Sequence, residues 1–96
     1  MRLFYTPEAI ADLQRLHDFV AEKHPLAARK IAIEIQDAAG RLKAFPRIGL
    51  PVSRADDPDL LRDLYIGHYT LRYLLSPPRS IHVLRIWHNK EAERDL

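Results

Sequence analysis

The stretch LRDLYIGHYTLRYLLSPPRSIHVLRIWH, residues 61–88, decides the fold because it contains three consecutive strand patterns. Its segments LRDLYI, YTLRYLL and IHVLRIW are each six or seven residues long and rich in residues that favour strands. Gly67 can take the positive φ of a tight turn after the first segment, and residues 76–80, with two prolines, predict a looser turn after the second. The stretch therefore predicts a three-stranded meander.

Upstream, residues 2–6 (RLFYT) predict a further strand, and two amphipathic helices follow it. Thr6 suits the N-cap of the first helix and Pro7 its first turn, and this helix must stop before Pro25. The second helix starts at that proline and ends before Pro46. Apolar positions three or four residues apart give each helix one apolar side: Ile10, Leu13, Leu16, His17 and Val20 in the first, and Leu26, Ala28, Ile31, Ile35, Ala38, Leu42 and Phe45 in the second.

These segments predict an α+β fold with the order β-α-α-β-β-β, in which the helical hairpin packs on one face of a small, mainly antiparallel sheet. Residues 46–60, PRIGLPVSRADDPDL, contain three prolines and a cluster of aspartates, so we expect an ordered but irregular connection there. The sequence shows no repeat and no second domain. We therefore expect a single domain over residues 1–96, with the uncovered face of the sheet available for binding.

Composition narrows the class of protein. The chain has no cysteine, which excludes disulfides and thiolate metal sites, and its net charge of +2 is too small to predict nucleic-acid binding by itself. No apolar run is long enough to cross a bilayer and the first residues do not resemble a signal peptide, so we expect a soluble, cytoplasmic protein that does not bind membranes. Positive charge is concentrated in residues 61–88, which hold four arginines and three of the five histidines against one acid.

Several chemistries lack their motifs. The three glycines are isolated, so there is no glycine-rich phosphate loop, and no His-Glu-x-x-His pattern provides a zinc helix. His82 and His88 are interpreted as separate strand residues rather than metal ligands, because no further ligands stand at suitable spacing. We therefore predict neither a metal nor a cofactor.

Cationic and aromatic side chains of the last three strands remain as candidates. Arg62, Arg72, Arg85, Trp87 and His88 form the predicted partner-binding set, because such side chains bind phosphates, stack on bases or hold acidic segments. Arg72 lies within a strand, so we expect it to face solvent or a partner on the open face of the sheet. Regular alternation puts Arg85 and Trp87 on one face of the strand and His88 on the other, so only a bulge or the end of the strand brings Arg85 and His88 together. A structural ion pair for Arg85 and a core position for Trp87 are the competing interpretations.

In four segments the chain resembles the RelE/ParE superfamily of toxins from type II toxin-antitoxin systems, and within it the ParE-like, plasmid-stabilisation branch. The segments are TPEAIADLQRLHDFVAE, RLKAFPRIGLPV, LLRDLYIGHYTLRYLL and IHVLRIWHNKEAER, in this order. The resemblance implies a small growth-arresting toxin that forms a hetero-oligomer with a cognate ParD-like or RelB-like antitoxin. It also implies two possible targets, which are DNA gyrase for ParE-like members and ribosome-bound mRNA for RelE-like members.

The resemblance favours the gyrase mechanism. RNA-cleaving members tend to carry an arginine where this chain has Thr70, and a basic or aromatic catalytic residue in the tail, where it has Lys90 and Leu96. His88 alone matches a histidine that some of these nucleases use. The leading hypothesis is therefore a toxin that inhibits gyrase by protein binding. The alternative is a metal-independent endoribonuclease in which His88 acts with Arg72 or Arg85 as the catalytic set, so whether the protein is an enzyme stays open.

Overall fold

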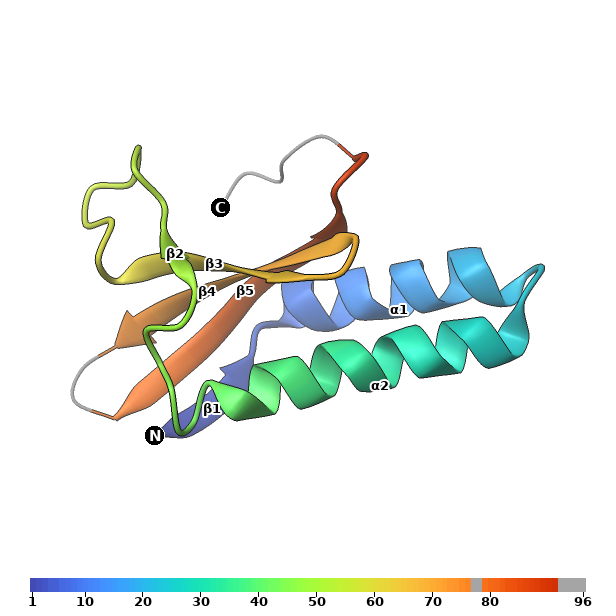
Figure 1. Cartoon of the computed structure of the whole chain (residues 1–96), viewed down its shortest axis with the longest axis horizontal. Coiled ribbons are helices and arrows are strands. Elements are labelled where there is room, and N and C mark those ends of the chain that lie inside the picture. Colours follow the sequence, from blue (N-terminus) through green and yellow to red (C-terminus); the bar gives the residue numbers. More distant parts are fainter. Residues whose placement is uncertain (77–78, 92–96) are drawn as a thin grey trace.

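The predicted α+β fold is confirmed by the computed structural model, which describes residues 1–76 and 79–91 (Figure 1). Residues 77–78, in the predicted looser turn, and 92–96, with the tail position Leu96, lie outside the described residues. A short extra strand, β2, occurs within the connection expected to be irregular. The elements are β1 (Arg2–Tyr5), α1 (Pro7–Ala21), α2 (Pro25–Arg41), β2 (Leu50–Pro51), β3 (Leu61–Ile66), β4 (Tyr69–Ser76) and β5 (Ser80–His88).

The sheet has five strands in the order β1-β5-β4-β3-β2. β1 pairs parallel with β5, and the other pairs are antiparallel, so the meander of β3, β4 and β5 forms the centre. Gly67 has a φ of 58° in the turn between β3 and β4, as the sequence predicts. Figure 1 shows both helices on one face of the sheet, with the connection between them projecting beyond the strand ends.

Thr6 is the predicted N-cap of α1, and its hydroxyl makes two hydrogen bonds. It accepts one from the Ala9 N–H (3.1 Å) and donates one to the Leu84 carbonyl (2.9 Å), so the same side chain starts α1 and fixes it to β5. None of the helices described is long and apolar enough to span a membrane.

The core lies between the helices and the inner face of β4 and β5. Its buried apolar residues are Ala9, Leu16, Ile35, Ala39, Leu42, Leu71, Tyr73, Leu75, Ile81, Val83 and Ile86. Three positions of the predicted apolar stripes are wrong, because Ile10 is 57% exposed, Leu26 83% and Phe45 61%. Phe45 lies beyond α2, which ends at Arg41 instead of continuing to Pro46. The sheet packs on the neighbouring stripe of α1 that contains Ala9, and Leu26 starts α2 at the projecting end of the hairpin.

Tyr73 connects the centre of the sheet to the β2 segment. Its hydroxyl donates to the Pro46 carbonyl (2.8 Å) and accepts from the Gly49 N–H (3.0 Å). A Cβ at Gly49 would lie 2.7 Å from the Tyr73 Oη and 2.9 Å from the Asp63 carbonyl oxygen, closer than real contacts allow. Glycine at this position is therefore required by close packing.

Substituting Gly49 and Gly40 by alanine should have opposite effects on the free energy of unfolding, measured by urea denaturation. Gly49→Ala should lower it by about 1–3 kcal/mol, because the added Cβ displaces Tyr73 or the backbone of β3. Gly40→Ala, inside α2 with no atom near its Cβ, should raise it by roughly 0.5–1 kcal/mol. Equal changes in both variants would contradict this packing.

Candidate functional site

Arg62 is a buried side chain that holds the loop carrying β2. Its Nε donates to the Gly49 carbonyl (2.9 Å), and its Nη1 donates to the carbonyl (2.8 Å) and the carboxylate (3.1 Å) of Asp59. Its Nη2 donates to the Arg47 carbonyl (3.2 Å). Four hydrogen bonds therefore commit this guanidinium to the loop, and its predicted contact with a partner remains a prediction.

Arg72 lies on the sheet face away from the helices, because it alternates with Leu71 and Tyr73 of the core. It does not face solvent as expected: it is 4% exposed, and its Nε and Nη2 donate to the two carboxylate oxygens of Asp63 at 2.7 and 2.9 Å. Asp63 stands directly opposite on β3. Asp63 is therefore the partner of Arg72 that the sequence did not predict, and the hairpin register places the two side chains opposite each other.

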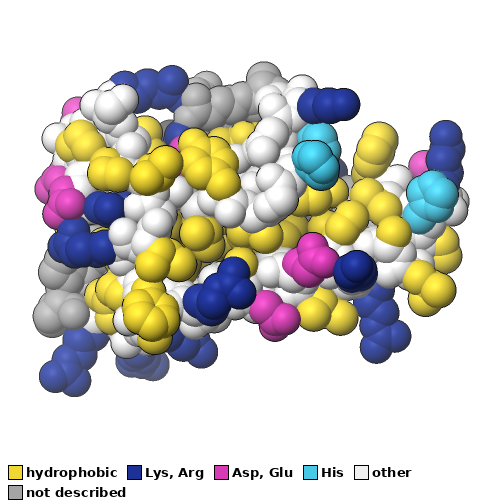
Figure 2. Space-filling view, in the orientation of Figure 1, with side chains coloured by type: hydrophobic (Ala, Val, Ile, Leu, Met, Phe, Trp, Pro, Cys, Tyr) yellow, Lys and Arg dark blue, Asp and Glu magenta, His cyan; other side chains and the backbone are white. Residues whose placement is uncertain are grey.

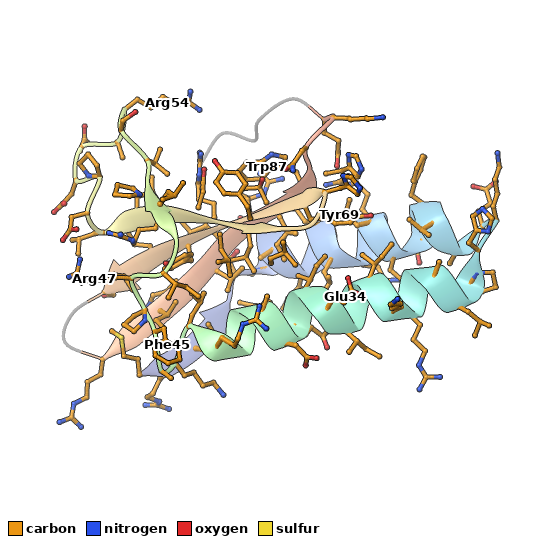
Figure 3. The ribbon with its side chains drawn as sticks, in the orientation of Figure 1. Glu34, Phe45, Arg47, Arg54, Tyr69 and Trp87 are labelled. Atoms are coloured by element: carbon orange, nitrogen blue, oxygen red, sulfur yellow. The ribbon has the colours of Figure 1, made fainter. Side chains whose placement is uncertain are left out.

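Trp87 completes this cluster on the open face. The guanidinium carbon of Arg72 lies 5.2 Å from the centroid of its ring, a cation-π contact, and the indole is 6% exposed. Figure 3 shows Trp87 over the sheet on the side opposite the helices. Its burial agrees with the interpretation as a packing residue, although on the outer rather than the inner face of the sheet.

The predicted alternation of β5 is wrong after Val83, because the strand contains a bulge. Tyr73 pairs with Val83 while the preceding Arg72 pairs with Arg85, so one residue is extra on β5. Ile86 consequently joins the inner core, together with Val83, instead of facing away from it. Ile86, Trp87 and His88 therefore face the sides opposite to those predicted by a regular strand, whereas the side chain of Arg85 still reaches Asp12 on the helix side.

Asp12 of α1 forms hydrogen bonds with the bulged segment of β5. Its carboxylate accepts hydrogen bonds from the Arg85 Nε (2.7 Å) and Nη2 (3.0 Å) and from the Ile86 backbone N–H (3.0 Å). Arg15 Nη2 adds a longer contact at 3.4 Å. The side chain of Asp12 is 5% exposed. Burial alone would raise its pKa, but hydrogen bonds from Arg85 and the Ile86 N–H outweigh burial and lower it; the same ion pair raises the pKa of Arg85.

Arg15 extends this network to the end of β5. Its Nη1 donates to the Glu91 carboxylate (2.7 Å), whose other oxygen accepts the His88 backbone N–H (2.9 Å). Arg85 and His88 therefore belong to one network, connected through Asp12, Arg15 and Glu91. Those last three residues were missed from the sequence. Asp12 gave a detectable signal, because it stands three residues after Ala9 and four before Leu16, within the buried stripe of α1.

The ring of His88 is half-buried among aromatic neighbours. It stacks on His68 with centroids 6.0 Å apart and meets the ring of Tyr69 edge-on at 5.1 Å. Its Nδ1 accepts the Lys90 backbone N–H (3.0 Å), so the neutral ring carries its proton on Nε2. His82, by contrast, stacks on Phe4 (5.4 Å). No group of three or more potential metal ligands occurs in the described part of the chain.

His88 and Tyr69 border a hollow of about 600 Å³ where α1 extends beyond the sheet. Apolar side chains of α1 form its wall, among them Phe19, which is 80% exposed. Figure 3 shows Tyr69 at the end of the sheet nearest the projecting hairpin. The lining residues are Arg15, Leu16, Phe19, Val20, Tyr69, His88, Lys90 and Glu91.

Comparison with known proteins now identifies the family. Residues 3–93 match the family model of the ParE toxin of type II toxin-antitoxin system, parDE. The chain belongs to this ParE toxin family. It is therefore a toxin of a type II toxin-antitoxin system, and membership implies an antitoxin partner.

Two relatives agree with this assignment. Toxin RelE2 of Caulobacter vibrioides is 29% identical to this ParE-family chain over 87 residues, which cover 91% of the chain and 93% of RelE2. A solved structure of the chromosomal ParDE TA system from P. aeruginosa matches with a TM-score of 0.76 at 22% identity, covering 92% of this chain and 95% of the other. The second likeness concerns the fold.

The Asp12 network should contribute strongly to the stability of this ParE-family toxin. Asp12→Asn should lower the free energy of unfolding at pH 7 by about 2–3 kcal/mol, because it leaves the partly exposed Arg85 without its carboxylate. Asp18→Asn is the matched control on the exposed side of α1 and should change it by less than about 0.5 kcal/mol. Urea denaturation measures both values.

The difference between wild type and Asp12→Asn should also depend on pH. The folded-state pKa of Asp12 lies below its ordinary value of 3.8, so its stabilisation is complete above that value and is lost as pH falls through the lowered pKa. The two unfolding free energies should therefore converge in acid. A difference that stays constant from neutral pH into strong acid would contradict the assigned ion pair.

Proposed function

We propose that this ParE-family toxin arrests growth by binding a protein, with DNA gyrase as the leading target, and that a cognate antitoxin neutralises it. One observation carries the proposal. Arg72 and Arg85, the two arginines that the nuclease alternative would use, are each paired with a carboxylate of the same chain at 2.7 Å. A metal-independent nuclease needs cations that stabilise the charge developing on a phosphate. Asp63 and Asp12 already neutralise these two guanidinium groups.

The neighbours of His88 support the same proposal. Thr70 stands where RNA-cleaving members of the superfamily tend to have an arginine, and its hydroxyl donates to the Asn89 side-chain oxygen at 2.5 Å. The Asn89 backbone N–H donates in turn to the His68 carbonyl (2.8 Å). This part of the chain therefore has its polar groups engaged in holding the end of β5.

A protein target is also supported by the hollow beside α1. Its wall of Leu16, Phe19 and Val20 is chemically suited to an apolar side chain, and Phe19 exposes most of its ring in the free toxin. Apolar clefts with exposed aromatic residues favour protein partners, because burial of the aromatic ring provides much of the binding free energy. We propose that the target inserts an apolar side chain into the hollow.

The alternative is the ribosome-dependent mRNA endoribonuclease, in which His88 acts as general base with Arg72 or Arg85. One arrangement favours it: His88, Tyr69 and Lys90 all line the hollow, so an imidazole and a lysine stand together there. To act as a base, His88 must first release the Lys90 N–H from its Nδ1. In that mechanism Asp12 or Asp63 must release its arginine to the phosphate. The two mechanisms therefore differ in what they require of His88.

A supercoiling assay with purified gyrase and toxin distinguishes them. We expect the wild-type toxin to inhibit supercoiling in molar excess, with His88→Ala retaining growth arrest and translated messages remaining intact in cells. Phe19→Ser should weaken inhibition about tenfold, because it removes the exposed aromatic ring of the hollow. Ile33→Ser, which removes a 47% exposed side chain of α2, is the matched control and should inhibit like wild type.

Unaffected gyrase together with cleaved messages would refute the gyrase proposal. Loss of both cleavage and toxicity in His88→Ala, with folding unchanged, would then establish the nuclease alternative. Equal inhibition by wild type and Phe19→Ser would exclude the hollow as the contact site while leaving gyrase as the target.

A further inference from the structure

A second exposed surface lies at the other end of the molecule, where α2 leads into β2. Phe45 is 61% exposed, Ile48 45% and Leu50 60%. These are large side chains for which burial against a partner would be favourable. Figure 2 shows hydrophobic side chains on this side of the molecule with Lys and Arg side chains next to them, and Figure 3 shows Phe45 near the end of α2.

The charge of this segment has one sign. Residues 38–55 contain Arg41, Lys43, Arg47 and Arg54 and no acid. Arg47 pairs with Asp59 at 2.5 Å. Within residues 1–76 and 79–91, the side chains of Arg41 and Lys43 make no hydrogen bond or ion pair. We call Arg41, Lys43, Phe45, Ile48 and Leu50 the basic apolar patch.

This patch contrasts with the arginines of the strands. Arg62, Arg72 and Arg85 have carbonyl or carboxylate partners within the chain, so acids of a binding protein would have to displace those partners. The cations of the basic apolar patch need no such exchange. Arg41 lies in the last turn of α2, where its positive charge interacts favourably with the helix dipole. The same guanidinium can still bind a carboxylate of a partner.

The adjoining strand restricts how a partner can bind. β2 lies at one edge of the sheet, with β1 at the other, and Pro51 has no N–H to donate to an added strand. Pairing of a further strand with β2 is therefore disfavoured, and side chains provide the main contacts. Carboxylates that pair with Arg41 and Lys43, combined with apolar side chains that cover Phe45 and Ile48, match the surface in charge and polarity.

We propose that the basic apolar patch is a docking site for an acidic, apolar segment of the cognate antitoxin. The inference rests on the antitoxin partnership in the proposed function and assigns it a surface separate from the hollow beside α1. Charge complementarity selects this occupant: residues 38–55 carry four cations and no acid, so a second copy that docked through the same patch would bring like charges together.

The test titrates purified toxin with the purified antitoxin encoded beside it, by calorimetry at several salt concentrations. The double variant Arg41→Glu/Lys43→Glu should lose affinity about tenfold or more and show a flatter salt dependence. Phe45→Ser should lose about tenfold with an unchanged salt dependence. Arg29→Glu/Lys30→Glu, a charge reversal at exposed positions in the first half of α2, is the matched control and should bind like wild type.

Growth assays separate this inference from the proposed target. The patch variants should still arrest growth when expressed alone but escape neutralisation when the antitoxin is co-expressed. Wild-type affinity in the patch variants, or equal losses in the patch and control variants, would overturn the docking site without affecting the gyrase proposal. Thermal unfolding of the free variants checks that each remains folded, and Lys43→Ala provides a milder substitution with the same expected direction.

Discussion

The fold depends on one buried carboxylate, that of Asp12. It joins the first helix to the last strand by accepting hydrogen bonds from both the guanidinium of Arg85 and the backbone N–H of Ile86. Because the N–H belongs to the residue that follows the bulge, the same contact satisfies a backbone donor at the point where strand pairing is irregular. The carboxylate thereby fixes the helical hairpin against the sheet and determines the orientation of the end of β5.

The bulge in turn arranges the candidate site. It directs Ile86 into the core, Trp87 towards Arg72 on the open face, and His88 towards Tyr69 and the hollow. The ion pairs that produce this arrangement also withdraw the arginines from solvent. A scaffold of this kind leaves the hollow beside α1 and the basic apolar patch as exposed surfaces, and both support the proposal that the toxin works by binding proteins.

The sequence predicted those parts of the fold that depend on neighbouring residues. Strand patterns, the Thr6 cap and the turn at Gly67 are local, and each is confirmed. The bulge and the Asp12 ion pair were missed because Asp12 and Arg85 are 73 positions apart. The sequence around each residue gives no indication that the other is its partner. Alternation rules also assume a regular strand, so one inserted residue was enough to reverse the predicted side of Trp87 and His88.

The central claim is that the strand arginines are internally paired, and the exchange rates of their Nε–H protons measure this directly by NMR. The Nε–H groups of Arg62, Arg72 and Arg85 all donate hydrogen bonds within the chain, to Gly49, Asp63 and Asp12. We predict slow exchange for these three at neutral pH, unchanged by an added single-stranded RNA, and fast exchange for exposed Arg29. Exchange as fast as that of Arg29, or a shift of the Arg72 and Arg85 signals on RNA addition, would contradict the claim.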